Sequence, residues 1–445
     1  MRKPLSILAI AALVILATRP PAGAQAWNID ARSVGMSGIG GDQNVFAQTI
    51  AEARGDHSIV LPLGLLQVWK DHNVFHPSKP EFDPARAVEY AANPLHLQFG
   101  RSGSSAGARF VYDVRNAQLQ RNLSVYEGFT PASMRASGLV APKYGHTFWL
   151  DDARSGKRQG IFVGAGPHLS LRTNLVSDDR LVQALDSGVN AAPNQRLTMR
   201  NATTAQFAAA ITGGYRARFA ASAEPGASPA SAYLSVNVNY LRGIHYEDVD
   251  LGLQLQTGRD GTLTSTAGPA LALTRQLATG GNGVSFDLGV GVTYKGFELG
   301  FSGNNLANRI NWHGATRRPY ALNSLFDGTG SLVKGPELQV GGVRIISPTD
   351  YRGNLGFRSR AFSVQTELTR ASQKTWFNGG LELNFSRLQF RGAASLAREE
   401  WHPSAGLSVA MKRTLWLDLA GFETTANIER ERRFGVATSL RWSPR

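Results

Sequence analysis

Residues 286–294 read FDLGVGVTY, and this stretch decides the fold class because its apolar and polar side chains alternate without a break. One face carries the apolar set Phe286, Leu288, Val290, Val292 and Tyr294. The opposite face carries Asp287, Gly289, Gly291 and Thr293. A period of two is the signature of a β-strand. The alternation recurs at residues 234–240, 362–368, 377–385, 388–396 and 434–442. The series predicts one antiparallel sheet with an apolar face and a polar, small-residue face.

Two all-β architectures fit such a sheet. Strands of a soluble β-sandwich usually run about five or six residues, whereas these run roughly nine to eleven, the length that crosses a bilayer at a tilt. Aromatic residues also stand at strand ends, as Phe286 and Tyr294 do, which is typical of the girdles of an outer-membrane barrel. We therefore predict an all-β fold, a transmembrane antiparallel β-barrel of about 14 (14–16) strands, with the sandwich as the alternative.

The connections between the predicted strands are of two lengths. Lys295-Gly296 and residues 258–261 (GRDG) suit tight turns, because glycine reaches positive φ and Asp-Gly is a hairpin signal. Residues 174–204, with a short helix expected at DDRLVQALDSG, and residues 303–336 read as long loops. Short turns at one end and long loops at the other are typical of barrels in the outer membrane.

The beginning of the chain resembles an export signal. Arg2 and Lys3 precede an apolar run over residues 5–17, and small residues in A-x-A order follow. A retained membrane anchor is disfavoured, because a spanning helix needs about 20 apolar residues. The chain has no cysteine, which excludes a lipid-modified N-terminus, disulfides and thiolate metal sites. We expect a signal peptide over residues 1–26 and a location in the cell outer membrane.

Residues 27–105 do not alternate, and we expect them to form an N-terminal hatch, or plug segment, with short helices inside a barrel of residues 106–445. Helical segments are indicated at NVFAQTIAEA and at DPARAVEYAANP, where Asp83 can cap a helix that begins with Pro84. The preceding stretch, residues 30–41 (DARSVGMSGIGG), is rich in glycine. Glycine permits the close backbone approach that a crowded lumen requires. A flexible leader to the first strand is the alternative.

DARSVGMSGIGG resembles the opening of mature chains in the FadL-like superfamily of fatty-acid transporters, which includes PorV-like and TraF-like outer-membrane proteins. FELGFSGNNLAN (residues 297–308) is similar to the strand that leads into an xNL turn in the PorV-like and TraF-like branches. The resemblance implies a fourteen-stranded barrel with an internal hatch. Ser37 stands where the family has the second glycine of GMGG, and the family's Asn-Pro-Ala is absent nearby. The implied hatch residues are Asp30, Ala31, Arg32, Gly35, Met36, Gly38 and Gly40.

Charge gives the next constraint. The chain carries a net charge of +14. A basic barrel can contact lipopolysaccharide phosphates at its rim or favour anionic solutes in its lumen. Unpaired charge in a narrow space is costly, so we expect the lumen-facing charges to pair and to brace the hatch. Those charges are Asp287, Glu298, Glu367, Glu382, Arg387, Arg391, Asp418 and Arg441. The basic excess is dispersed, so no nucleic-acid partner is predicted.

Signals for catalysis are weak. His72 and His76 have H-x-x-x-H spacing, but Asn73 stands where a zincin has its glutamate, and Pro77 disfavours a helix. Ser105 lies in a formal G-x-S-x-G match, but a strand pattern follows where the elbow requires a helix. We therefore expect no catalytic residue, no metal and no cofactor, and a chain that is not an enzyme.

Three functions remain, and transport of a small hydrophobic or amphipathic solute is preferred. The second is a scaffold for secretion, conjugation or surface assembly, and the third is a surface enzyme. An apolar pocket around Met36 would favour transport, whereas a filled polar lumen with apolar loops such as residues 310–326 would favour a scaffold. Expected partners are outer-membrane lipid and lipopolysaccharide, the barrel assembly machinery, the solute, and, for a scaffold, a secretion partner protein.

Overall fold

The computed structural model describes most of the chain, and the residues it describes are mainly strand. They are residues 30–41, 44–61, 95–99, 133–141, 143–151, 157–178, 180, 192–220, 230–261, 263–265, 269, 271–322, 332–371, 374–397, 400–423 and 432–443. The predicted signal peptide, Ser105, His72, His76 and the helix expected at residues 83–94 lie outside these residues. No helix within the described part of the chain is long and apolar enough to cross a membrane.

Two short helices precede the sheet. Helix α2 (Ala31–Gly35) begins at Asp30, whose carboxylate accepts a hydrogen bond from the Ser33 amide. Helix α3 (Val45–Arg54) begins at Asn44, whose side chain accepts from the Ala47 amide. Gly55 ends α3 in the left-handed conformation, with φ of 79°. The sequence therefore caps α3 at both ends, and its position agrees with the helix expected at NVFAQTIAEA.

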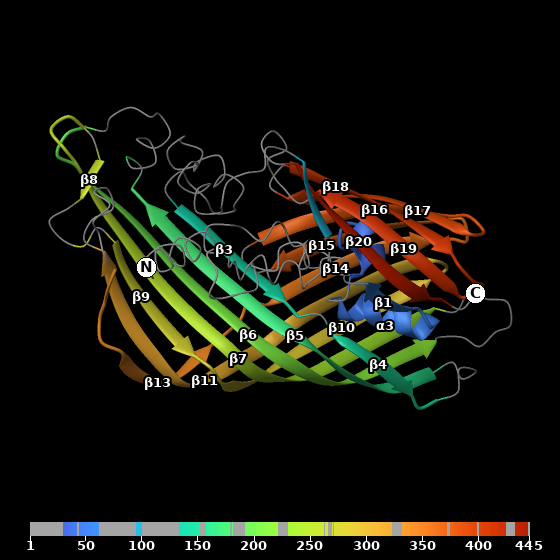
Figure 1. Ribbon diagram of the computed structural model, residues 1–445. Helices are drawn as coiled ribbons and strands as arrows, with labels where there is room; N and C mark the ends of the chain where they lie inside the picture. The colour runs from blue at the N-terminus through green and yellow to red at the C-terminus, as the bar shows by residue number, and fades with distance from the viewer. Residues whose placement is uncertain are drawn as a thin grey trace.

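The sheet is one continuous antiparallel ladder in which successive long strands are neighbours. Its first part contains the strands β5 (Lys157–Ser177), β6 (Arg196–Ala220), β7 (Ser231–Thr257), β9 (Leu271–Ala278), β10 (Gly281–Tyr294) and β11 (Phe297–Leu322). Its second part contains β14 (Asp350–Arg358), β15 (Phe362–Ala371), β16 (Lys374–Asn384), β17 (Leu388–Ala397), β18 (Glu400–Ala410), β19 (Leu415–Glu423) and β20 (Arg432–Trp442). The fold is all-β, as predicted. Figure 1 shows these strands curving around α3 at the end of the molecule where the C-terminus lies.

In several places two strands lie end to end and pair with successive parts of the same neighbouring strand. β1 (His57–Leu61) and β2 (Leu95–Phe99) both pair with β20, which brings the two ends of the described chain together. β3 (Ser133–Val140) and β4 (Tyr144–Trp149) both pair with β5. β9 and β10 both pair with β7, and β13 (Leu338–Ile345) and β14 both pair with β11. The short β8 (Leu263–Ser265) and β12 (Leu332–Lys334) pair with the last residues of β7 and β11.

The two faces of this curved sheet, called the wall below, divide polar from apolar side chains as the alternation predicts, and the apolar face is the exposed one. Ser235, Asn237 and Asn239 of β7 are buried, whereas Val238 and Tyr240 beside them are exposed. Large exposed side chains continue across the second part of the sheet: Leu355, Val364, Leu368, Phe377, Leu381, Leu383 and Phe390. A soluble sandwich would bury that apolar face, and this wall instead presents it to its surroundings.

The long loop predicted over residues 303–336 is wrong for its first part, because β11 continues to Leu322. The GNNLAN motif is a bulge within this strand and not a turn. Asn305 and Ala307 have φ of 58° and 42°, and the register against β10 shifts opposite them. A bulge re-aims the strand without ending it. The loop predicted over residues 174–204 is likewise shorter, because β6 begins at Arg196.

Candidate functional site

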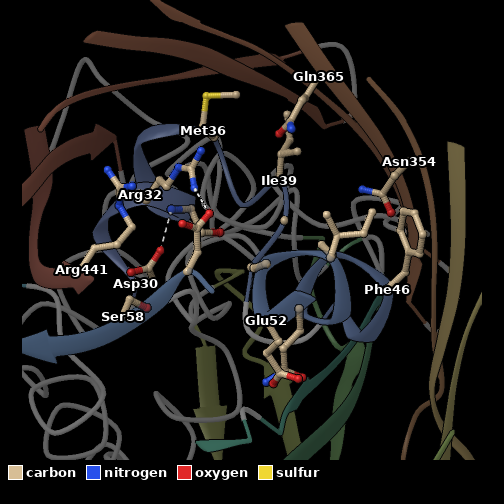
Figure 2. Close-up of a pocket in the computed structure, with 18 of the residues that line it drawn as sticks. Asp30, Arg32, Met36, Ile39, Phe46, Glu52, Ser58, Asn354, Gln365 and Arg441 are labelled. Atoms are coloured by element: carbon tan, nitrogen blue, oxygen red, sulfur yellow. Dashed lines mark hydrogen bonds and ion pairs between the residues drawn. The ribbon is translucent and has the colours of Figure 1, made fainter. Parts of the chain in front are cut away.

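The N-terminal segment (residues 30–41 and 44–56) lies against the inner face of the wall, with a cavity of about 920 Å³ between the two. Met36, Ile39 and Phe46 line the cavity from the segment, and Asn354 and Gln365 line it from the wall. Figure 2 shows these side chains arranged around the open space. The cavity lining therefore combines apolar and polar side chains, and both the N-terminal segment and the strands contribute to each kind.

Helix α2 is attached to the second part of the wall by hydrogen bonds and ion pairs. The Arg32 guanidinium meets Glu382 of β16 through two bonds, Nε to Oε2 at 3.2 Å and Nη2 to Oε1 at 3.1 Å. Asp30 accepts from the Ser439 hydroxyl of β20 at 3.0 Å. Ser37 and Ser404 of β18 join through their hydroxyls at 2.7 Å. The Glu382 carboxylate raises the pKa of Arg32 above its usual range, because it stabilises the charged guanidinium.

Glu382 is the first member of a buried chain of alternating charges. Arg391 Nε donates to Glu382 Oε2 at 2.7 Å, and its Nη2 lies 3.3 Å from Asp418 Oδ1. Arg441 Nε donates to Asp418 Oδ2 at 3.0 Å. All four wall residues are buried. Arg32 meets Glu382 bidentately, which is a geometrically specific contact, so this chain of charges orients α2 on the inner face of the wall.

Glu367 of β15 anchors the turn between the two helices. Its Oε2 accepts from Asn44 Nδ2 at 2.9 Å and from the Gly40 amide at 3.3 Å. Arg352 of β14 balances its charge, with Nη1 to Oε1 at 3.2 Å. Asn44 also donates to Asn354 Oδ1 at 2.7 Å. The Asn44 side chain therefore caps α3 with its oxygen and binds the wall with its nitrogen.

Helix α3 contacts the first part of the wall mainly through close packing of an apolar side chain against glycines. Phe46 lies over Gly291 of β10 and Gly300 of β11, and a Cβ atom at either glycine would overlap its ring. The Met36 side chain uses the same device at Gly380 of β16, where a Cβ atom would lie 2.8 Å from its Cε. The inward glycines of the alternating strands are thus recesses for side chains of the N-terminal segment.

Charged groups complete the α3 contact. Arg54 Nη2 lies 2.5 Å from Glu298 Oε1 of β11. Glu52 accepts from the Thr147 hydroxyl of β4 and lies 3.8 Å from Arg216 Nε of β6. Burial raises the pKa of Glu52 above its ordinary value, and the charge of Arg216 opposes this shift.

Another buried ion pair lies beside α3. Lys143 lies between β3 and β4, and its Nζ is 2.5 Å from Oδ2 of Asp287 on β10. Asp287 also accepts from Asn237 and Asn239, each at 3.0 Å. Its Oδ1 accepts from the Asn305 amide of β11 at 2.9 Å, so the aspartate of the FDLGVGVTY stretch is surrounded by donors from three parts of the chain.

The inner face of the first part of the wall becomes apolar further along the strands. Trp312 of β11 is fully buried, stacks on Tyr246 with ring centroids 5.6 Å apart, and donates to Gln206 Oε1 at 3.0 Å. The apolar cluster around it is Ala208, Ala210, Leu241, Tyr246, Ala278, Ile310 and Ala315. Residues 310–322, expected as an exposed apolar loop, thus form a strand with Ile310 and Trp312 turned inward; residues 323–326 lie outside the described residues.

Most sequence-predicted site residues lie in this arrangement. Those on the buried inner face are Asp287, Glu298, Glu367, Glu382, Arg391, Asp418 and Arg441. Those in α2 or the turn after it are Ala31, Arg32, Gly35, Met36, Gly38 and Gly40, with Asp30 as the N-cap. The placement of Arg387 in the lumen is wrong, because Arg387 is exposed in the turn between β16 and β17, one residue before the alternation resumes.

Sequence reasoning missed Arg352, Lys143, Arg216 and Glu52. Arg352 and Arg216 lie at inward positions of β14 and β6, so the period of two could have identified them once those strands were delimited. Lys143 lies between two strands, where no periodic signal exists. Among the described residues, no group of three or more His, Asp or Glu side chains could hold a metal ion.

Comparisons with known proteins leave the family open. No family model matches the chain, and no curated protein matches it. Among solved structures, the CymD monoaromatic hydrocarbon channel is 12% identical, with a TM-score of 0.31 over 70% of this chain and 86% of that chain. The siderophore receptor PirA from Pseudomonas aeruginosa is 9% identical, with a TM-score of 0.21 over 70% of each chain. Both TM-scores lie below 0.5, so the function of this chain is inferred from its own geometry.

Proposed function

We propose that the chain is an outer-membrane β-barrel that passes a small amphipathic solute around an internal hatch formed by its N-terminal segment. The observation that carries the proposal is the cavity of about 920 Å³, partly open to its surroundings, between that segment and the wall. Met36, Ile39 and Phe46 offer it an apolar side, and Arg54 and Glu298 offer it a charged side. A solute with both an apolar body and a polar group fits such a lining.

The inside-out wall supports the membrane location. Its exposed face is rich in aliphatic and aromatic side chains, and its lumen face carries hydrogen-bonded polar groups. An outer-membrane barrel requires this division. Counting the end-to-end strand pairs as single spans, we propose fourteen spans, from β1 with β2 to β20. The last span has Trp442 exposed near its end, which suits recognition by the barrel assembly machinery.

A non-enzymatic role is part of the proposal, and the scaffold function is the less favoured alternative. An exposed apolar loop over residues 310–326 would favour a scaffold function. In the described part of this segment, residues 310–322, Ile310 and Trp312 are instead buried in the apolar cluster, which argues against a scaffold surface there. An apolar pocket around Met36 would favour transport. Met36 and Ile39 both line the cavity.

A reversible lock on the hatch tests the proposal. The Ser37 and Ser404 hydroxyls are 2.7 Å apart, and the chain has no cysteine of its own. Ser37→Cys together with Ser404→Cys should form a disulfide between hatch and wall. We expect oxidised protein in lipid vesicles to release a small amphipathic dye no faster than empty vesicles, and a reductant to restore release. Deletion of residues 30–54 should open a steady ion conductance in a planar bilayer.

The matched control places the disulfide within the wall. Thr212 of β6 and Asn239 of β7 face each other across the ladder and share a hydrogen bond of 2.7 Å. Thr212→Cys with Asn239→Cys should leave dye release unchanged. Equal dye release from locked and reduced hatch would refute transport past a moving hatch. Failure of every form to insert into the bilayer would refute the barrel itself.

A further inference from the structure

Three exposed arginines lie side by side on the outer surface of the wall. Arg242 of β7 pairs with Asn282 of β10, Asn282 with Asn311 of β11, and Asn311 with Arg344 of β13. Arg309 lies two residues before Asn311 on the same strand, and all three arginines are exposed. Neighbouring strands are about 4.8 Å apart, so this arginine row (Arg242, Arg309 and Arg344) spans roughly 14 Å.

The level of the row along the strands is informative. On β10 the exposed apolar side chains extend from Tyr294 to Phe286. A bilayer-crossing strand needs about 9–11 residues, so a strand that enters the membrane at Tyr294 leaves it near residue 284. Arg309 pairs with Val284, and Asn282 follows two residues later. The arginine row therefore lies where lipid head groups begin, given the membrane location in our proposed function.

Two of the three side chains of the row, Arg242 and Arg344, are held by amides and not by carboxylates. Arg242 Nη1 donates to Asn282 Oδ1 at 2.9 Å, and Arg344 Nε donates to Asn311 Oδ1 at 3.2 Å. Within the described part of the chain, no carboxylate lies within ion-pair distance of these two arginines or of Arg309. An amide orients a guanidinium but leaves its charge and its other N–H donors available.

Two other arginines of the long strands differ in this respect. Arg200 of β6 lies 2.5 Å from Asp250 Oδ2, and Arg318 of β11 is paired with Glu337. Both positions lie further from the apolar band than the arginine row does. Arg200 and Arg318 therefore have carboxylate partners, whereas no carboxylate among the described residues is paired with the arginines of the row.

We propose that the arginine row is a binding site for the phosphates of lipid A, the anionic glycolipid of the outer leaflet. Guanidinium groups bind phosphate oxygens through paired N–H donors. A disaccharide that carries a phosphate at each end matches a row of separated cations better than a single phosphate does. The adjoining exposed side chains Tyr240, Phe286 and Ile346 contact the acyl chains below. The proposal rests on the membrane location, and it deepens that location by naming the lipid and the site.

The test counts lipid A bound to the full chain. The protein is reconstituted into phosphatidylcholine vesicles with a minor fraction of bisphosphorylated lipid A and extracted in mild detergent, and retained lipid A is measured by native mass spectrometry. The test variant is Arg242→Gln with Arg309→Gln and Arg344→Gln. We expect it to retain at least about tenfold less lipid A than the wild type, because each basic residue near an anionic surface contributes to lipid binding.

The control variant, Arg196→Gln with Arg200→Gln and Arg318→Gln, removes the same charge from arginines bonded to Gln254, Asp250 and Glu337. It should retain lipid A as the wild type does. Dephosphorylated lipid A should not be retained by any form. Equal losses in both variants, or displacement of lipid A by inorganic phosphate alone, would overturn the site. Insertion into pure phosphatidylcholine vesicles is scored separately, so failure of the barrel proposal is distinguishable from failure of the site.

Discussion

The two parts of the wall hold the N-terminal segment, the proposed hatch, in different ways. The short-strand half, β14 to β20, has strands of 9 to 11 residues and meets α2 with charge, through Arg32 and Glu382. The long-strand half, β5 to β11, has strands of up to 27 residues and meets α3 with shape, through Phe46 over Gly291 and Gly300. Charge orients one helix, and close packing sets the depth of the other.

This difference has a consequence for release of the hatch. Water can solvate Arg32 and Glu382 as they separate. Their ion pair can therefore be replaced by hydration of each charge without movement of a strand. Phe46 can leave its recess only by a displacement of the α3 helix, because the recess is formed by backbone. We therefore expect α2 to detach more readily than α3. The predictions that follow perturb each half in turn.

The largest effect is expected at the charged contact. Glu382→Gln leaves Arg32 and Arg391 facing each other without the carboxylate that lies between them. Removing one partner of a buried ion pair typically costs about 3–5 kcal/mol. At about 1.4 kcal/mol per tenfold change, amide hydrogen exchange in residues 31–35 should accelerate by roughly a hundredfold or more, while exchange in residues 45–54 should change less.

An exposed ion pair supplies the control. Glu337→Gln breaks the contact with Arg318 at the far end of the long-strand half, where both side chains are well exposed. Such pairs contribute at most about 1 kcal/mol, so exchange in α2 should stay at the wild-type rate. Equal acceleration in both helices on Glu382→Gln would show that the hatch detaches as one unit and would end the distinction between the halves.

The sequence predicted which face of the wall a side chain lies on better than it predicted which residue that side chain contacts. The period of two placed Asp287, Glu367 and Glu382 on the lumen side, because a strand has only two faces. It failed in β11 since the bulge at Asn305 and Ala307 inserts residues with positive φ and so interrupts the periodicity. The Arg32–Glu382 pair joins positions 350 residues apart. No local pattern encodes such a contact, which exists only once the wall has curved around the hatch.

A smaller effect is expected at the recess for Phe46. Gly300→Ala places a methyl group where the Phe46 ring lies, and overpacking of this kind costs about 1–3 kcal/mol. Exchange in residues 45–54 should accelerate, and vesicles containing the variant should release dye faster than vesicles containing the wild type. The double variant Gly300→Ala with Phe46→Ala should lose less stability than the two single variants combined, because the overlap is gone.

Gly353 of β14 is the matched position for this substitution, since a Cβ atom there meets nothing within 4 Å. Gly353→Ala should leave exchange and dye leakage at wild-type levels. Strict additivity of the Gly300 and Phe46 substitutions would mean that the ring does not occupy the recess, and α3 would then have to be held by its charged contacts alone.

The smallest effect concerns pH, and it belongs to the long-strand half alone. Burial raises the pKa of Glu52 above its ordinary 4.5, so the folded state favours the protonated carboxyl. The resulting stabilisation of α3 is fully present below pH 4.5 and is lost as the pH rises through the raised value. Glu52→Gln keeps the neutral form, so exchange in residues 45–54 should depend less on pH than in the wild type. Identical pH profiles for variant and wild type would contradict this origin, whereas α2, held by Arg32, should show the same profile in both.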